Sequence, residues 1–187
     1  MENIIKSIKS YYPVPNESID SLCANFTKHV FPRKHIFIKG GRLDSEIYFI
    51  EKGITRSFFY VNGDEITSWF SKEGDVTFGL LDLYRNKPGF EYVETIEETV
   101  VYSIPIKRME ELCQKDIHIA NWFRVIHQEC VLALQYHRID NLTLNSKDRY
   151  EQLLKRIPYI TQRVQLTYIA SFIGISNSTL SRIRNII

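Results

Sequence analysis

Side chains that can donate hydrogen bonds to a polyanion gather near the end of the sequence. They carry hydroxyl, amide or guanidinium groups and lie at Thr167, Ser176, Asn177, Ser178, Thr179, Ser181, Arg182 and Arg184. Such groups hold phosphate oxygens, and Asn and Arg can also pair with base edges. Residues 147–187 have seven basic and two acidic side chains, a net charge of +5, while residues 1–146 carry −3. This asymmetry favours a polyanionic partner for the tail, although a solvated basic surface would have the same charge.

The spacing of apolar residues in this tail predicts the elements that position these groups. The two apolar patterns are Leu166, Ile169, Ala170 and Ile173, and then Leu180, Ile183 and either Ile186 or Ile187. Ala170 is small enough for a close helix crossing, and Gly174 can take the left-handed conformation that ends a helix. Ile175 can fill the gap between the helices, and Ser176 or Asn177 can cap the second one. The pattern predicts a helix-turn-helix whose second helix enters a major groove; the alternative is a helical hairpin that only packs.

Upstream, between about residues 30 and 105, the apolar period changes from helical to alternating, which indicates strands. Four apolar runs, at 36–38, 47–50, 54–61 and 66–70, are followed by one or two more between Val93 and Ile104. The Asn62-Gly63 pair predicts a type I′ hairpin, because both residues tolerate positive φ. Strands at this spacing, separated by glycine turns, predict an antiparallel barrel or jelly roll.

Helices flank this β region. Residues 1–29 predict two short helices broken at residues 11–15, with Asn16 or Ser18 as the cap of the second. A short helix is expected at 107–114. The polar segment 140–146 predicts a hinge, and Ser146 is the expected cap of a helix that ends before Pro158.

A long helix is predicted at residues 116–141. Its apolar stripe consists of Ile119, Trp122, Phe123, Ile126, Cys130, Ala133, Tyr136 and then Ile139 or Asp140. A helix of roughly 25 residues is about 38 Å long, which is too long for one small barrel to cover. We therefore expect part of the stripe to meet a second copy of the chain, with packing inside one chain as the alternative.

Several classes of protein are not expected. No run of about 20 apolar residues could span a membrane, and the N-terminus lacks the apolar core of a signal peptide, so we expect a cytoplasmic protein. The cysteines Cys23, Cys113 and Cys130 form no CxxC pair, which predicts buried free thiols.

Enzymatic chemistry is not expected either. The five His residues have no metal-binding spacing, and no GxSxG, P-loop, GxGxxG or HExxH motif occurs. The acidic run Glu91, Glu94, Glu97 and Glu98 is expected to be a solvated rim. We predict no metal, no cofactor and no catalytic residue.

The order of β-roll, long helix and C-terminal helix-turn-helix is similar to the Crp/Fnr family of bacterial regulators. The resemblance spans nearly the whole chain, is most specific in the tail, and there looks like the branch common in Bacteroidetes. It rests on Arg149-Tyr150, Pro158, the segment from Ile169 to Ser176 and the segment from Thr179 to Arg184. It implies a roll of the cyclic-nucleotide-binding type that receives an effector and alters the pose of a dimeric DNA-binding domain. The implied effector pocket contains Phe78, Gly79, Leu80, Leu81 and Tyr92.

The sequence departs from the family's cyclic-nucleotide members. Leu80 stands where their phosphate cassette has Glu, and Glu91 and Glu94 lie near the position of their Arg. Because a cyclic phosphate needs a cation, tight cyclic AMP binding is not expected. The cysteine cluster of the oxygen-sensing members is missing. With Ile187 last in the sequence, we also expect no complete wing after the recognition helix.

The sequence thus predicts an α+β protein. Its expected parts are an effector roll with N-terminal helices at 1–115, a dimerisation helix at 116–141 and a DNA-binding domain at 142–187. The predicted function is a homodimeric transcriptional regulator that binds double-stranded DNA, with an unknown small-molecule effector and RNA polymerase as further candidate partners. The alternative is a ligand-binding or protein-interaction module with a degenerate helix-turn-helix.

Overall fold

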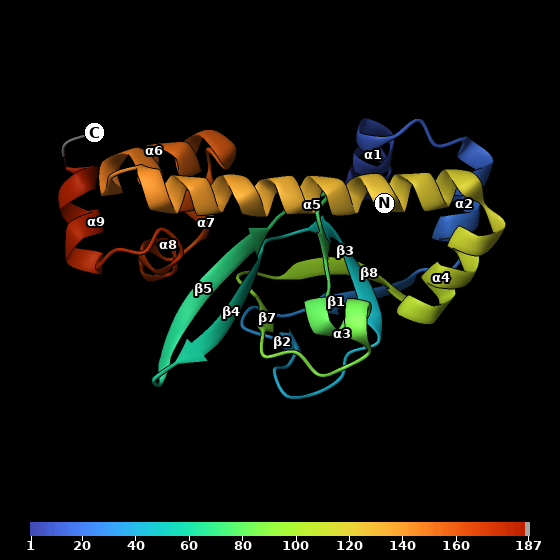
Figure 1. Cartoon of the computed structure of the whole chain (residues 1–187), viewed down its shortest axis with the longest axis horizontal. Coiled ribbons are helices and arrows are strands. Elements are labelled where there is room, and N and C mark those ends of the chain that lie inside the picture. Colours follow the sequence, from blue (N-terminus) through green and yellow to red (C-terminus); the bar gives the residue numbers. More distant parts are fainter. Residues whose placement is uncertain (186–187) are drawn as a thin grey trace. The chain divides into compact units, whose positions relative to one another are not determined.

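The strands of the computed structural model, which describes residues 1–185, form two four-stranded sheets (Figure 1). One sheet has the order β1 (Thr27–Phe31), β8 (Thr99–Pro105), β3 (Glu46–Lys52) and β6 (Val76–Thr77), and the other has β2 (Ile36–Ile38), β7 (Tyr92–Thr95), β4 (Thr55–Val61) and β5 (Asp64–Ser71). β8 pairs antiparallel with both β1 and β3, and β2 pairs antiparallel with β7. The predicted antiparallel roll is confirmed. The first strand, β1, begins before the region in which the sequence predicts strands. Its residues are mostly polar, so the apolar pattern does not reveal it, and it is held by pairing with β8.

The turn between β4 and β5 has the geometry that its residues predict. Asn62 has a φ of +53° and Gly63 a φ of +91°. A type I′ turn needs positive φ at both central residues, so the predicted hairpin is confirmed.

Strand β3 is buried on both of its faces, which explains its unbroken apolar run. Ile47 and Ile50 have no exposed surface, and Tyr48 and Phe49 are 7% and 2% exposed. Tyr48 and Ile50 join a core cluster inside the roll, whereas the Phe49 ring stacks on Trp122 of the long helix at a centroid distance of 6.0 Å. The roll core therefore includes a helix as well as the two sheets.

The two N-terminal helices are present as α1 (Glu2–Tyr11) and α2 (Asn16–Cys23). The predicted cap of α2 is wrong, because Pro15 occupies the N-cap position and no side chain caps the helix. Asn16 is already helical and Ser18 is buried. The helix expected at 107–114 is present as α4 (Ile106–Lys115), directly after β8.

The long helix, α5 (Ile117–Thr143), begins where the sequence predicts and runs further. Since it includes residues 140–143, the expected hinge shrinks to residues 144 and 145. The first half of its predicted stripe lies in the chain's own core, with Ile119, Trp122 and Ile126 at most 5% exposed. These positions pack within one chain, and the expectation that another part of the stripe meets a second copy stays a prediction. The exposed large apolar side chains of the second half are Val131, Leu132, Leu134, Tyr136, Ile139 and Leu142.

Four short helices follow: α6 (Ser146–Arg156), α7 (Ile160–Arg163), α8 (Leu166–Phe172) and α9 (Asn177–Arg184). The predicted cap of α6 is off by one residue. Asn145, not Ser146, caps α6, because its Oδ1 accepts the N–H groups of Lys147 and Asp148, each at 3.0 Å. Pro158 lies just beyond the end of this helix, as expected.

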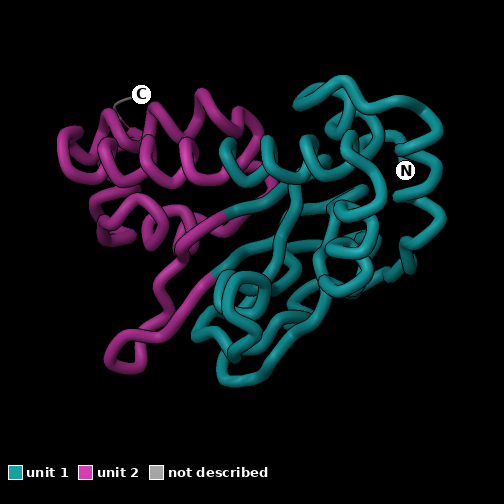
Figure 2. The backbone as a smooth tube through the Cα atoms, turned by 45° about the vertical axis from the view of Figure 1, so that its right-hand side comes forward, with its two compact units in different colours: residues 1–57, 70–129 teal, residues 58–69, 130–187 magenta. Residues whose placement is uncertain are grey.

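The backbone divides into two compact units, shown in different colours in Figure 2. One unit contains residues 1–57 and 70–129, and the other contains residues 58–69 and those from 130 onward. The tip of the β4–β5 hairpin is thus grouped with the C-terminal helices. The division at residues 115 and 141, which follows the order of the elements, stays a prediction.

Candidate nucleic-acid interface

The turn between α8 and α9 ends α8 at a left-handed glycine. Gly174 has a φ of +68°, as its position predicts. The N–H of Ile175 donates to the Ala170 carbonyl at 3.0 Å, and the N–H of Gly174 donates to the Ser171 carbonyl at 3.2 Å. These two bonds are the pairing of a Schellman motif, which satisfies the last carbonyls of a helix. Ala170 is only 1% exposed, as a close crossing of the helices requires.

A hydroxyl cap and a buried apolar side hold α9. Ser176 is the cap, since its Oγ accepts the Thr179 N–H at 3.1 Å. Leu180 and Ile183 are 1% and 9% exposed, as expected for the inner side. The last two predicted apolar positions, Ile186 and Ile187, lie outside the described residues.

The opposite side of α9 is entirely polar. At 3.6 residues per turn, Ser178, Ser181, Arg182 and Asn185 face away from the buried pair, and Asn177 and Arg184 lie on one flank of the helix. All six are exposed. We call them the outer face of α9. The sequence prediction missed Asn185, although it lies one turn after Ser181.

Three predicted site residues, Thr167, Ser176 and Thr179, do not belong to the outer face. The Ser176 hydroxyl is engaged in capping, and Thr179 is half-buried beside it, with its Oγ1 2.9 Å from the Ser176 Oγ. Thr167 is exposed on the first turn of α8, on the other helix of the motif. The candidate interface thus consists of the outer face of α9 and the exposed Thr167 hydroxyl of α8.

Arg149 supports the motif from α6. Its Nε donates to the Ile173 carbonyl and its Nη1 to the Leu144 carbonyl, both at 2.9 Å. These carbonyls end α8 and α5, where backbone acceptors have no helical partner. The sequence gives Arg149 as a basic residue and as part of the family resemblance, whereas the structure shows that its side chain connects α6 to the ends of α8 and α5.

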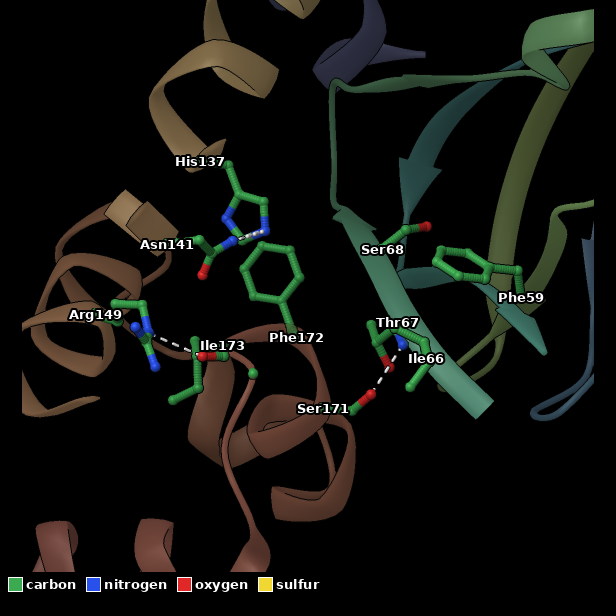
Figure 3. Close-up of a pocket in the computed structure, with 11 residues that line it drawn as sticks. Phe59, Ile66, Thr67, Ser68, His137, Asn141, Arg149, Ser171, Phe172 and Ile173 are labelled. Atoms are coloured by element: carbon green, nitrogen blue, oxygen red, sulfur yellow. Dashed lines mark hydrogen bonds between the residues drawn. The ribbon is translucent and has the colours of Figure 1, made fainter. Parts of the chain in front are cut away.

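The C-terminal unit also contains a cavity of about 460 Å³ (Figure 3). Phe59 and Ile66 of the hairpin line it, as do His137 and Phe172. The Thr67 N–H donates to Ser171 Oγ at 2.9 Å, and the His137 ring stacks on Phe172 at 4.3 Å. These contacts hold α8 against both β5 and α5. Burial lowers the pKa of His137; the Arg156 guanidinium lowers it further, while Asp140 acts in the opposite sense.

In the roll, the residues predicted for the effector pocket lie at the start of α3 (Leu80–Arg85) and at the start of β7 (Tyr92–Thr95). Gly79 is the N-cap of α3, and Leu80 and Leu81 are exposed at its start. The Phe78 ring packs against His127 of α5 at 5.8 Å, and Tyr92 packs against Gly40, where even a Cβ would lie 2.6 Å from its ring. The cavities described for the two units have other linings.

A carboxylate of the chain itself occupies the start of α3. Asp82 is 4% exposed, and its Oδ1 accepts the Asp44 N–H at 2.8 Å. Its Oδ2 lies so close to Gly79 that a Cβ there would overlap it. The glycine is therefore needed because Asp82 folds back over the N-terminus of its own helix.

The expectation that Glu94 belongs to a solvated rim is wrong. Glu94 is 8% exposed and Arg56 only 1%. The Glu94 Oε1 accepts from Nε of Arg56 at 2.8 Å and from its Nη2 at 2.7 Å. A buried carboxylate needs such a partner, which β4 supplies to β7 across the sheet.

The cysteines are free, as predicted, but half-buried instead of fully buried. Burial raises the thiol pKa of Cys23 and of Cys113. Within residues 1–185, no three His, Cys, Asp or Glu side chains are grouped so that they could hold a metal ion. The described helices include none that is long and apolar enough to cross a membrane.

Known proteins share both the sequence pattern and the fold. Residues 28–116 match the cyclic nucleotide-binding domain family. A curated relative, the HTH-type transcriptional regulator ArcR of Staphylococcus aureus, is 26% identical over 168 residues, which are 88% of this chain and 68% of the relative. FixK2 of Bradyrhizobium japonicum superposes with a TM-score of 0.75 at 15% identity, over 86% of this chain and 83% of FixK2. A regulator assigned to the Crp/Fnr family from Eubacterium rectale superposes with a TM-score of 0.70 at 15% identity, over 95% of this chain and 87% of that one.

The chain therefore carries a cyclic nucleotide-binding domain at its N-terminal side and has, over nearly its whole length, the fold of Crp/Fnr-type transcriptional regulators. The resemblance predicted from the tail and the glycine-punctuated roll is confirmed.

Proposed function

We propose that this protein is a dimeric, sequence-specific DNA-binding regulator of transcription that acts in the cytoplasm and is not an enzyme. The observation that carries the proposal is the outer face of α9. Six exposed polar residues, two of them arginines, cover α9 from one flank to the side opposite Leu180 and Ile183, which pack the helix in place. A rigid helix with this face fits the major groove of B-DNA, with its first residues at base edges.

Each residue of the interface has a chemical task in this proposal. Asn177 and Arg182 are the candidates for bidentate pairing with adenine and guanine, respectively. Ser178, Ser181 and Arg184 bind bases or phosphates from the same side. Thr167 holds a phosphate from α8 through its hydroxyl, and this contact fixes the register of the motif. Ser176 and Thr179 act indirectly, through the cap of α9.

A second copy of the chain is proposed to cover the exposed side of α5. Val125, Leu132 and Ile139 recur every seven residues, and Gln128, Gln135 and Leu142 follow each of them by three. This is the a/d spacing of a coiled coil. Leu132, Ile139 and Leu142 are 47%, 42% and 73% exposed in the single chain. Burying them against the same residues of a partner gives two motifs for two half-sites about one DNA turn apart.

The roll is proposed to work without cyclic AMP. A cyclic phosphate is held by amides at the start of a helix together with a nearby cation. At α3 the Asp82 carboxylate already lies over Gly79, and Leu80 supplies no polar group. Arg56, a buried cation of β4, is already paired with Glu94 of β7. Calorimetric titration with cyclic AMP should give no saturable binding, and micromolar affinity would refute this part.

The proposal is tested with fragmented genomic DNA of the source organism. We expect the purified chain to retain specific fragments at low salt and to release them steeply as salt rises, because phosphate contacts displace counterions. Arg182→Ala should weaken the specific complex by roughly 1–3 kcal/mol. Arg33→Ala, an exposed arginine of the roll, is the matched control and should change nothing. Retention of no fragment at low salt would favour a ligand-binding or protein-interaction module with a degenerate motif.

A further inference from the structure

An aromatic cavity of the roll has a lining that includes none of the predicted effector residues. It has a volume of about 350 Å³ and lies within the N-terminal unit. Phe31 at the end of β1, Phe37 of β2 and Tyr48 of β3 form its walls. This volume is at the lower end of the range for small-molecule sites.

The aromatic walls present a preformed apolar slot. The Phe31 ring stacks on Phe37 at 5.4 Å and on His35 at 4.6 Å, with interplanar angles of 15° and 17°. Phe37 meets Tyr48 edge-on at 4.9 Å. Both phenylalanines are only partly buried and rest on the core cluster of the roll. A flat ring can therefore extend the stack without moving the core.

The rim of the slot is positively charged. Lys39 and Arg42 line it from the loop between β2 and β3, and both are exposed. Neither takes part in an ion pair among residues 1–185. The lining has one carboxylate, Asp44, which accepts hydrogen bonds from uncharged donors. Its Oδ1 accepts the Glu46 N–H at 2.9 Å and its Oδ2 the Tyr48 hydroxyl at 3.1 Å.

We propose that this cavity binds a small planar aromatic acid. The ring lies against Phe31 and Phe37, and the carboxylate is held by Arg42 and Lys39. A charge-assisted pair with Arg is planar and can be bidentate, which orients the ring relative to the rim. Asp44 accepts hydrogen bonds from Tyr48 and from the Glu46 amide, and it forms no ion pair with Lys39 or Arg42 among the described residues.

A role of the bound acid as an effector of DNA binding rests on the proposed function. Binding itself is independent of DNA. The experiment below contains no DNA, so a failure to bind the acid and a failure to bind DNA are separate outcomes.

The test is isothermal titration of the full chain with trans-cinnamate and with its neutral analogue cinnamamide. We expect saturable binding of cinnamate at one site per chain, and affinity for cinnamamide at least tenfold lower. Arg42→Gln and Lys39→Gln should each weaken cinnamate about tenfold, the equivalent of 1.4 kcal/mol, and leave cinnamamide unchanged. Arg33→Gln, an exposed arginine that does not line the cavity, is the matched control.

Three results would overturn the proposal. The first is no saturable binding of cinnamate at millimolar concentration. The second is equal affinity for acid and amide, which would leave an apolar groove without charge recognition. The third is an equal loss in Arg33→Gln and Arg42→Gln, which would make the effect one of overall charge. Because these substitutions lie on exposed loops, unchanged melting curves will show that each variant is folded.

Discussion

Replacement of Gly174 by alanine isolates the turn on which the DNA-binding motif depends. A Cβ at this position would have no atom within 4 Å, so the added methyl meets open space. The backbone is nevertheless left-handed, with a φ of +68°. An L side chain in that conformation costs about 1–2 kcal/mol. We therefore expect Gly174→Ala to lower the free energy of unfolding by about 1–2 kcal/mol through conformation alone.

The matched control is the same substitution at a glycine without that constraint. Gly89 does not have a left-handed φ, and its nearest neighbour, Asp82 Oδ2, would be 3.4 Å from a Cβ. Alanine there restricts the unfolded chain and is expected to stabilise the protein by up to about 1 kcal/mol. Gly174→Asn should cost less than Gly174→Ala, because Asn tolerates the left-handed region.

Urea denaturation, followed by Trp fluorescence and by circular dichroism, measures these differences. The two alanine variants should have effects of opposite sign. If Gly174→Ala were as stable as the natural chain, or if both alanine variants lost the same free energy, the strain assigned to the turn would be absent. DNA binding of Gly174→Ala should fall in parallel, since the turn sets the direction of α9.

Three further predictions follow from other parts of the structure. Leu132→Asp should convert a dimer to monomers in sedimentation, whereas Leu134→Asp, equally exposed at 47% but off the a/d seam, should not; monomers in the natural chain would contradict the seam. Glu94→Gln should destabilise the protein by roughly 3–5 kcal/mol, because the buried Arg56 loses the charge of the carboxylate that it contacts; a loss below about 1 kcal/mol in urea denaturation would mean that water reaches the pair. The pKa of His137 is lowered on folding, so the unfolded chain binds the proton more tightly and stability falls as pH drops below the ordinary value of 6.5. His137→Phe should flatten the pH dependence of the unfolding free energy below that value, and an unchanged profile would exclude His137 as its source.

Short-range geometry made much of this protein predictable. The left-handed Gly174, the type I′ turn at Asn62 and Gly63, and the inward Leu180 and Ile183 all depend on residues a few positions apart. The local spacing of these residues determines these features, so they can be predicted without knowledge of the rest of the chain. The caps were less predictable, because neighbouring polar residues such as Asn145 and Ser146 can compete for the same backbone groups.

Features that depend on contacts between distant parts of the chain could not be predicted from the sequence. The helical spacing in α5 correctly predicts that Ile119, Trp122 and Ile126 share one side, but it does not tell which part of the apolar stripe packs within the chain. Glu94 was expected at a solvated rim because a lone carboxylate avoids burial, yet β4 brings Arg56 to it from 38 residues away. The sequence also gives no sign that the Arg149 side chain donates to the Ile173 carbonyl, 24 residues away, because packing of α8 against α6 brings the two together.

The order of the elements, the roll and the helix-turn-helix can be predicted without coordinates, since periodicity and turn chemistry are local properties. The position of Asp82 over the start of α3 and the aromatic slot lined by Phe31, Phe37 and Tyr48 became evident only in the folded chain. The free energy of a charged or aromatic side chain depends on which distant groups surround it. Those groups are brought together by strand pairing and helix packing, which no short segment specifies.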